Sequence, residues 1–289
     1  MTAPHYDDPD WCEREYNPRV TISDLPAVFG RWLETAAATR ARLPHQAGIA
    51  YGADPRETLD LFRADRPRGA VVFIHGGYWR ASSKDEVSWA AAALVPAGFS
   101  TLVLNYPLCP QTTVAGIAES CRRAIAFAWT SLLGEAERRR LIVSGHSAGG
   151  YLTASMLATD WPVRGLPAAP FAGGLSISGV FDLRPLLRTS MNELIRLTPE
   201  QASGWSLHEA PKPSPGAPLE LLVGGDETAE FHRQSALMAA AWPILARAPI
   251  AVPGRHHFDV VEQIGHHGTP VFDAVLRLAR QSSGASQPR

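Results

Sequence analysis

The chain of 289 residues has too few cysteines for a disulfide scaffold and no surplus of either charge. Its three cysteines, Cys12, Cys109 and Cys121, show no CxxC or Cys/His ligand spacing, so we expect neither a disulfide framework nor a structural zinc site. The 27 Lys and Arg residues nearly equal the 28 Asp and Glu residues. That balance argues against binding to nucleic acid or to an anionic membrane surface.

The sequence also has no apolar segment long enough to cross a bilayer. Its longest apolar stretch, residues 236–252, contains Pro243, Arg247 and Pro249, whereas a transmembrane helix needs about 20 mostly apolar residues. The first residues are acidic and lack a basic start followed by an apolar core, so we expect no secretory signal and a cytoplasmic location.

Apolar runs alternate with helical patterns along most of the chain, which predicts a mostly parallel sheet with helices on both faces. A half-exposed strand is expected at residues 56–64, and further strands at 70–74, 100–106, 140–147, 173–179, 219–225 and 249–252. Helices are expected at residues 85–97, 114–132, 152–158, 231–242 and 271–280.

This alternation predicts one domain over residues 1–281, followed by a flexible tail at 282–289. Residues 1–48 form an N-terminal lead-in that contains a helix capped by Asp24. Residues 181–218 break the rhythm and are expected to form a cap-like insertion over the carboxyl edge of the sheet, where ligands bind in such folds.

Residues 145–149, GHSAG, match the G-x-S-x-G pattern between a buried strand and a helix. The sharp turn of such an elbow strains the serine backbone, and small flanking residues relieve its clashes while the hydroxyl stays clear of the sheet. Ser147 is therefore the candidate nucleophile.

Residues 75–79, HGGYW, follow another predicted buried strand and match a glycine-rich oxyanion loop. Glycines let backbone N–H groups approach a substrate carbonyl without obstruction by a Cβ. Gly76 and Gly77, with Tyr78 as a further candidate, are expected to supply one donor and Ala148 the other.

A serine nucleophile needs a histidine base and a carboxylate, which follow it in that chain order: serine, acid, histidine. Adjacent pairs supply both, with Asp226 and Glu227 as acids and His256 and His257 as bases. Asp182 is a third acid candidate, although capping of the following helical segment is its more ordinary role. The histidines near the C-terminus lack an accompanying acidic ligand set, so we expect no metal and no cofactor.

Together the motifs resemble the kynurenine formamidases (arylformamidases), a group of α/β-hydrolase fold serine hydrolases. The resemblance covers residues 13–265 and rests on EYNPR at 15–19, HGGYW at 75–79, GHSAGGYL at 145–152, VGGDETAEFHRQS at 223–235 and HHFDVVE at 256–262. It implies an α/β-hydrolase fold, with Ser147 as nucleophile and His257 as base. In the family, the catalytic acid directly precedes a Ser or Thr and stands four positions before the Phe of EFxRQS. These two criteria select Glu227 in this sequence, and Asp226 stays as the rival candidate.

The reaction implied by the resemblance is hydrolysis of N-formyl-L-kynurenine to L-kynurenine and formate through a formyl-enzyme. Tyr78 and Trp79 either stack on the substrate ring or pack beneath the insertion. The chain departs from the family where Trp205, Ser206 and Leu207 replace a usual Ser-Pro pair, and where Glu replaces the commoner Asp. A carboxylesterase for small acyl or aryl esters and a non-catalytic binding protein are the alternatives. The expected partner is a small-molecule substrate, with homodimer formation left open.

Overall fold

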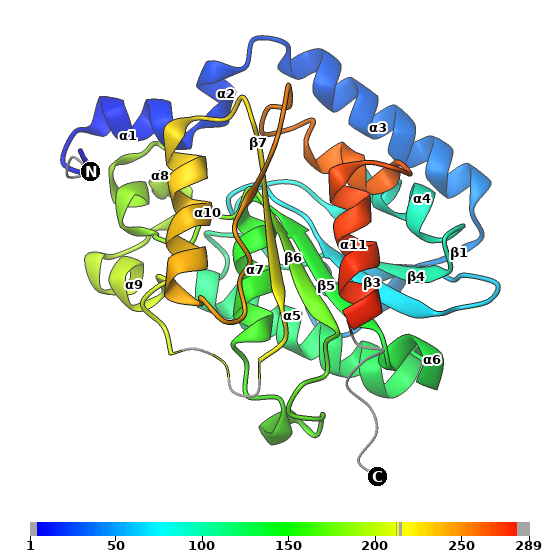
Figure 1. The fold of residues 1–289 in the computed structure, drawn as a ribbon. Coiled ribbons are helices and arrows are strands. Elements are labelled where there is room, and N and C mark those ends of the chain that lie inside the picture. Colours follow the sequence, from blue (N-terminus) through cyan, green and yellow to red (C-terminus); the bar gives the residue numbers. More distant parts are fainter. Residues whose placement is uncertain (1–4, 212, 214–215, 282–289) are drawn as a thin grey trace.

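The computed structural model describes residues 5–211, 213 and 216–281, in which eight strands form one sheet (Figure 1). The strand order is β1-β2-β4-β3-β5-β6-β7-β8. Strand β2 pairs antiparallel with β1 and β4, and the other pairs are parallel, as predicted. The strands are β1 (His45–Ala50), β2 (Thr58–Phe62), β3 (Gly69–Ile74), β4 (Phe99–Leu104), β5 (Leu141–His146), β6 (Gly173–Ile177), β7 (Leu219–Gly224) and β8 (Ile250–Val252).

Helices cover both faces of the sheet and create two hydrophobic cores. One core contains side chains of α5, α7 and α10, and the other contains side chains of α3, α4 and α11. Strand β3 contributes side chains to both cores. Val72 belongs to the first core and Val71 to the second, because successive side chains of a strand point to opposite faces of the sheet. The helices are α1 (Pro9–Tyr16), α2 (Pro18–Thr21), α3 (Leu25–Arg42), α4 (Ala91–Leu94), α5 (Val114–Phe127), α6 (Glu135–Arg138), α7 (Ala148–Leu157), α8 (Asn192–Ile195), α9 (Pro199–Gly204), α10 (Ala229–Ala241) and α11 (Pro270–Gln281).

The predicted helix over residues 85–97 is wrong in most of its length. Short 3-10 turns occupy Lys84–Glu86 and Ser88–Ala90, and only Ala91–Leu94 is α-helical. Distant and local side chains take the carbonyl groups that a helix would use, because Arg40 donates to the Asp85 carbonyl and Trp89 Nε1 donates to the Glu86 carbonyl. The helix predicted over 114–132 exists, but its last turn, Ala128–Leu132, is a π-helix.

The N-terminal lead-in has more structure than the sequence patterns predict. Helices α1 and α2 and strand β1 were not expected, and β1 contains a register shift between Gln46 and Ile49 that hides its alternation. The expected half exposure of β2 is also wrong. Its polar residue Asp60 is fully buried, where it binds Lys84 at 3.0 Å and accepts from the Gly48 N–H at 2.8 Å.

Helices α1, α2 and α3 run across one end of the sheet in Figure 1, while α8 and α9 of the insertion lie beside α10. The helix at 25–42 was predicted, but the Asp24 side chain makes no capping hydrogen bond. The predicted tail at 282–289 lies outside the described residues.

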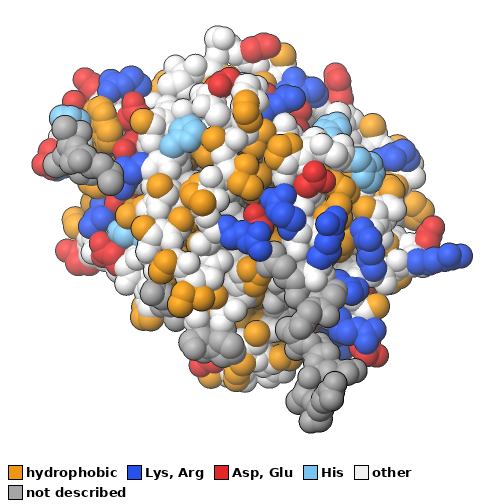
Figure 2. Space-filling view, viewed as in Figure 1, with side chains coloured by type: hydrophobic (Ala, Val, Ile, Leu, Met, Phe, Trp, Pro, Cys, Tyr) orange, Lys and Arg blue, Asp and Glu red, His pale blue; other side chains and the backbone are white. Residues whose placement is uncertain are grey.

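Acidic and basic side chains mix over much of the visible surface, and a group of Lys and Arg side chains gathers near the end of α11 (Figure 2). Part of that positive charge is compensated, since Arg277 of α11 binds the buried Glu220 at 3.2 Å. Among the described residues, no helix combines the length and apolar character that crossing a membrane requires.

Candidate active site

Ser147 sits on a strained turn between β5 and α7. Its φ of 56° is unusual for a residue with a Cβ, and its N–H donates to the Ile177 carbonyl at 2.8 Å. The turn leaves no room beside it. A Cβ at Gly149 would lie 2.0 Å from the Ile74 carbonyl oxygen, and one at Gly145 would lie 2.2 Å from the Gly149 oxygen. The flanking glycines are therefore required by contact, as the elbow motif predicts.

The glycine loop after β3 packs directly against this elbow. A Cβ at Gly76 would approach the His146 carbonyl oxygen to 2.9 Å, and Gly77 has a φ of +104°, which favours glycine. Among the described residues, the N–H groups of Gly77, Tyr78 and Ala148 donate to no protein acceptor. Such free donors beside a nucleophile could bind a negatively charged oxygen.

His257 and Glu227 form a closed pair at the same edge of the sheet. Glu227 Oε2 lies 2.6 Å from His257 Nδ1, and their side chains are 0% and 3% exposed, respectively. The other carboxylate oxygen, Oε1, accepts from the Gly224 N–H at 2.7 Å and from Ser178 Oγ at 2.5 Å. With Nδ1 engaged, Nε2 is the ring nitrogen that could receive a proton from Ser147.

The rival residues lie elsewhere. Asp226 is exposed, and its own N–H donates to the Arg255 carbonyl. His256 Nδ1 lies 3.4 Å from Asp259 Oδ1. Asp182, the third acid candidate, forms an ion pair with Arg184 at 2.8 Å and accepts from the Tyr6 hydroxyl at 3.0 Å. Burial raises the pKa of Asp182, but the bonds and charge of Arg184 oppose it and the pKa is lowered overall.

Two other buried histidines stabilise the surrounding backbone. His146 Nε2 bonds the His257 carbonyl at 2.8 Å, and burial together with the neighbouring His257 lowers the pKa of His146 well below its usual range. His75 bonds the Gly76 carbonyl at 2.8 Å and stacks on Tyr106 with ring centroids 4.2 Å apart. Burial lowers the pKa of His75 to about 4, so both rings are neutral at pH 7.

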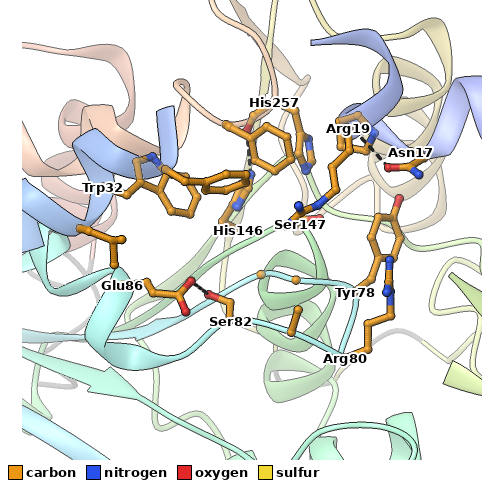
Figure 3. Close-up of a pocket in the computed structure, with 17 residues that line it drawn as sticks. Asn17, Arg19, Trp32, Tyr78, Arg80, Ser82, Glu86, His146, Ser147 and His257 are labelled. Carbon is orange, nitrogen blue, oxygen red and sulfur yellow. Dashed lines mark hydrogen bonds between the residues drawn. The ribbon is translucent and has the colours of Figure 1, made fainter. Parts of the chain in front are cut away.

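Ser147 and His257 line a cavity of about 490 Å³ that also contains Gly76, Gly77 and Tyr78 (Figure 3). Half of the other residues that line it belong to the N-terminal lead-in, namely Asn17, Pro18, Arg19, Phe29, Trp32 and Leu33. Among the described residues of 181–218, none lines this cavity. The helices before β1, rather than the described part of this insertion, therefore form the wall of the cavity.

The two aromatic residues of the glycine loop have different positions. Tyr78 lines the cavity, and its hydroxyl donates to the Tyr16 carbonyl of α1. Trp79 is fully buried outside the cavity, with its ring 5.3 Å from that of Tyr151. The suggestion that Trp79 stacks on a substrate ring is wrong, and the packing alternative describes its contacts better.

Several residues that line the cavity belong to a motif of the sequence but were not predicted to be part of the site. Asn17, Pro18 and Arg19 belong to the EYNPR motif, and Asn17 caps α2 by accepting from the Arg19 N–H at 3.1 Å. Ser178, which binds Glu227, carries no motif and could be found only from the fold. In the described part of the chain, no three His, Cys, Asp or Glu side chains are grouped so that they could hold a metal ion.

The fold and this edge of its sheet are those of an α/β-hydrolase. A family model described as BD-FAE matches residues 59–166, and the chain is a hydrolase. More particularly, it is related to the kynurenine formamidases along nearly its whole length. The kynurenine formamidase of Danio rerio is 28% identical over 286 residues, which cover 92% of this chain and 93% of that protein.

Two further relatives widen the comparison. The crystal structure of a proposed thioesterase from Silicibacter sp. has a TM-score of 0.81 and 29% sequence identity, and it covers 91% of this chain and 98% of its own. Esterase LipC of Mycobacterium tuberculosis is 29% identical over 125 residues, which cover 41% of this chain and 31% of that protein.

Proposed function

We propose that this chain hydrolyses N-formyl-L-kynurenine to L-kynurenine and formate, with Ser147, His257 and Glu227 as its catalytic triad. The observation that carries the proposal is the enclosed Glu227–His257 pair at the wall of the cavity that contains Ser147. The relationship to kynurenine formamidases supports the choice of substrate.

In the first step Ser147 Oγ attacks the formyl carbon while His257 Nε2 takes the hydroxyl proton. Glu227 holds the imidazole with its proton on Nδ1 and balances the charge that forms on the ring. The carbonyl oxygen becomes an oxyanion that the free N–H groups of Ala148 and of Gly77 or Tyr78 would bind. Loss of one such donor typically costs about 2.7–4 kcal/mol at the transition state.

In the second step the bond between the formyl carbon and the aniline nitrogen breaks. An anilide anion is a very poor leaving group, so the protonated His257 must deliver its proton to the nitrogen as the bond breaks. The product is a formyl ester on Ser147 and free L-kynurenine. His257 then activates a water molecule, which releases formate and restores the serine.

The cavity suits an aromatic substrate of modest size. Its volume of about 490 Å³ lies within the range of small-molecule sites, and Phe29, Trp32 and Phe258 provide aromatic surface. Aromatic rings prefer edge-to-face or offset contacts with one another, so these side chains could orient the aryl ring of the substrate.

The test is a comparison of kcat/KM for N-formyl-L-kynurenine and p-nitrophenyl acetate with the same enzyme preparation, with Ser147→Ala as the blank. We expect formamide turnover that disappears in the variant. Absence of formamide turnover in an enzyme that hydrolyses the ester would reject the formamidase assignment.

A carboxylesterase is the second candidate, favoured by the similarity to LipC over part of the chain. It would use the same residues and an easier leaving group, because a phenolate needs less protonation than an aniline nitrogen. The same comparison of substrates decides between the two.

A further inference from the structure

Two arginine side chains at the cavity lack an anionic partner. Arg19 and Arg80 both line the cavity, and among the described residues neither guanidinium forms an ion pair or hydrogen bond. Arg80 is half-buried, and its Nε is a buried donor without an acceptor. The side chain of Arg80 therefore brings a positive charge to the cavity wall that no carboxylate of the described residues pairs with, and an anionic ligand could bind there.

Neither of the two nearby carboxylates, Glu13 and Glu86, forms an ion pair with Arg19 or Arg80. Burial raises the pKa of Glu13, while hydrogen bonds from Asn17 and Ser190 and the charge of Arg80 lower it, and the pKa is lowered overall. The oxygens of Glu13 accept from Asn17 Nδ2 at 2.7 Å and from the Ser190 N–H at 2.8 Å. Glu86 supplies the carboxylate among the described lining residues, and it accepts from Ser82 Oγ at 2.9 Å.

The cavity is polarised around the serine. In Figure 3, Arg19, Tyr78 and Arg80 lie on one side of Ser147, and Trp32 and Glu86 lie on the other. Arg19 is held in place by its guanidinium, which lies 4.9 Å from the centre of the Phe29 ring.

We propose that Arg80 and Arg19 form an anion-binding subsite that takes a carboxylate on the leaving-group side of the substrate. This inference rests on the proposed hydrolytic function of Ser147 and narrows its substrates to aryl formamides or aryl esters that carry such a carboxylate. Guanidinium groups suit this role because their N–H donors match the two oxygens of a carboxylate.

The test uses two matched pairs of substrates. One pair is N-formyl-L-kynurenine and its carboxamide, and the other is the acetyl ester of a hydroxyphenylpropionic acid and that of the corresponding amide. Because a hydrogen bond to a charged group is stronger than a neutral one, we expect the wild type to prefer the acid of each pair about 10- to 100-fold in kcat/KM.

Arg80→Met should reduce this preference at least about tenfold, and Arg80→Lys should retain part of it because the charge remains. Arg19→Met should also reduce it. The matched control is Arg66→Met, which removes an exposed arginine in the loop before β3, at the amino end of that strand, and should keep the full preference.

A second measurement needs no variant and therefore cannot fail through misfolding. Rising ionic strength should lower the acid-to-amide ratio of the wild type, since salt screens attraction between charges. The subsite is refuted if the wild type shows no preference for the acids, or if the preference survives in both arginine variants.

The outcomes also separate this inference from the proposed function. An arginine-dependent preference within the ester pair, without turnover of N-formyl-L-kynurenine, would support the subsite and reject the formamidase. Equal hydrolysis of N-formyl-L-kynurenine and its carboxamide would reject the subsite and leave the formamidase intact.

Discussion

Replacing Glu227 by Gln tests the proposed triad with a nearly isosteric change. The amide oxygen of Gln can still accept from the Gly224 N–H and Ser178 Oγ, as Glu227 Oε1 does. The amide nitrogen then faces His257 Nδ1, which must become an acceptor. The ring proton moves to Nε2, and His257 can no longer take a proton from Ser147.

The expected loss is large because nothing replaces the carboxylate. The pair is almost entirely enclosed, at 0% and 3% side-chain exposure, so water cannot restore the tautomer. The analogous change in a serine protease triad lowers kcat about ten-thousandfold, which corresponds to about 5 kcal/mol of transition-state stabilisation. We expect a loss of the same order for Glu227→Gln.

The assay is steady-state hydrolysis of N-formyl-L-kynurenine or, if that is not turned over, of p-nitrophenyl acetate. Asp226→Asn is the matched control, because Asp226 is adjacent to Glu227 and exposed, and among the described residues its side chain forms no hydrogen bond or ion pair with His257. We expect it to stay within about threefold of the wild type, as changes outside the reacting groups usually do. A crippled Asp226→Asn enzyme, or a Glu227→Gln enzyme within tenfold of the wild type, would refute the reasoning.

Three further outcomes are expected. Ser147→Ala should abolish hydrolysis of every substrate together with fluorophosphonate labelling, and persistent labelling of another serine would move the nucleophile. His257→Ala should lose at least about a thousandfold in kcat and His256→Ala little, since only His257 lies beside Glu227, and the opposite ranking in a kinetic assay would reassign the base. The free energy of unfolding should fall as the pH drops from 6.5 towards 4, by about 3 kcal/mol for His75 alone. The reason is that the His75 ring is protonated in the unfolded chain over this pH range, whereas in the folded protein its pKa of about 4 keeps it neutral. Burial of His146 adds to this decrease in the free energy of unfolding. Urea denaturation curves at several pH values that show no decrease would contradict the prediction.

Some features of the site followed from local sequence because they depend on few residues. A buried strand that ends in G-x-S-x-G must turn sharply, and contacts as short as 2.0 Å leave no space for a Cβ at Gly149. The glycine loop at residues 75–77 could likewise be predicted from its own few residues and the strand before it. The mostly parallel character of the sheet also followed from the alternation of apolar runs and helical patterns, because strands with helices on both faces are buried on both faces, whereas the order of the strands came only from the structure.

The choice between adjacent acids needed more than local pattern. Composition and spacing left Asp226 and Glu227 open, and the resemblance to a family selected Glu227. The structure places Glu227 against His257 because the turn after β7 directs it inward, where Gly224 and Ser178 hold its second oxygen. Whether this carboxylate is the catalytic acid is decided by the kinetic comparison above.

The wall of the cavity was decided by tertiary structure alone. Arg19 and Trp32 lie more than a hundred residues before Ser147. The EYNPR motif contributes to the family resemblance, but neither that motif nor any apolar period indicates that the helices of these residues border the cavity. Trp79 likewise sits next to a cavity residue, yet its ring packs against Tyr151 of α7. The sequence by itself determined the elbow, the glycine loop and the parallel sheet, because strand and turn geometry act between near neighbours. Only the folded chain decided which distant surfaces enclose them, because that depends on how apolar faces of separate helices bury one another.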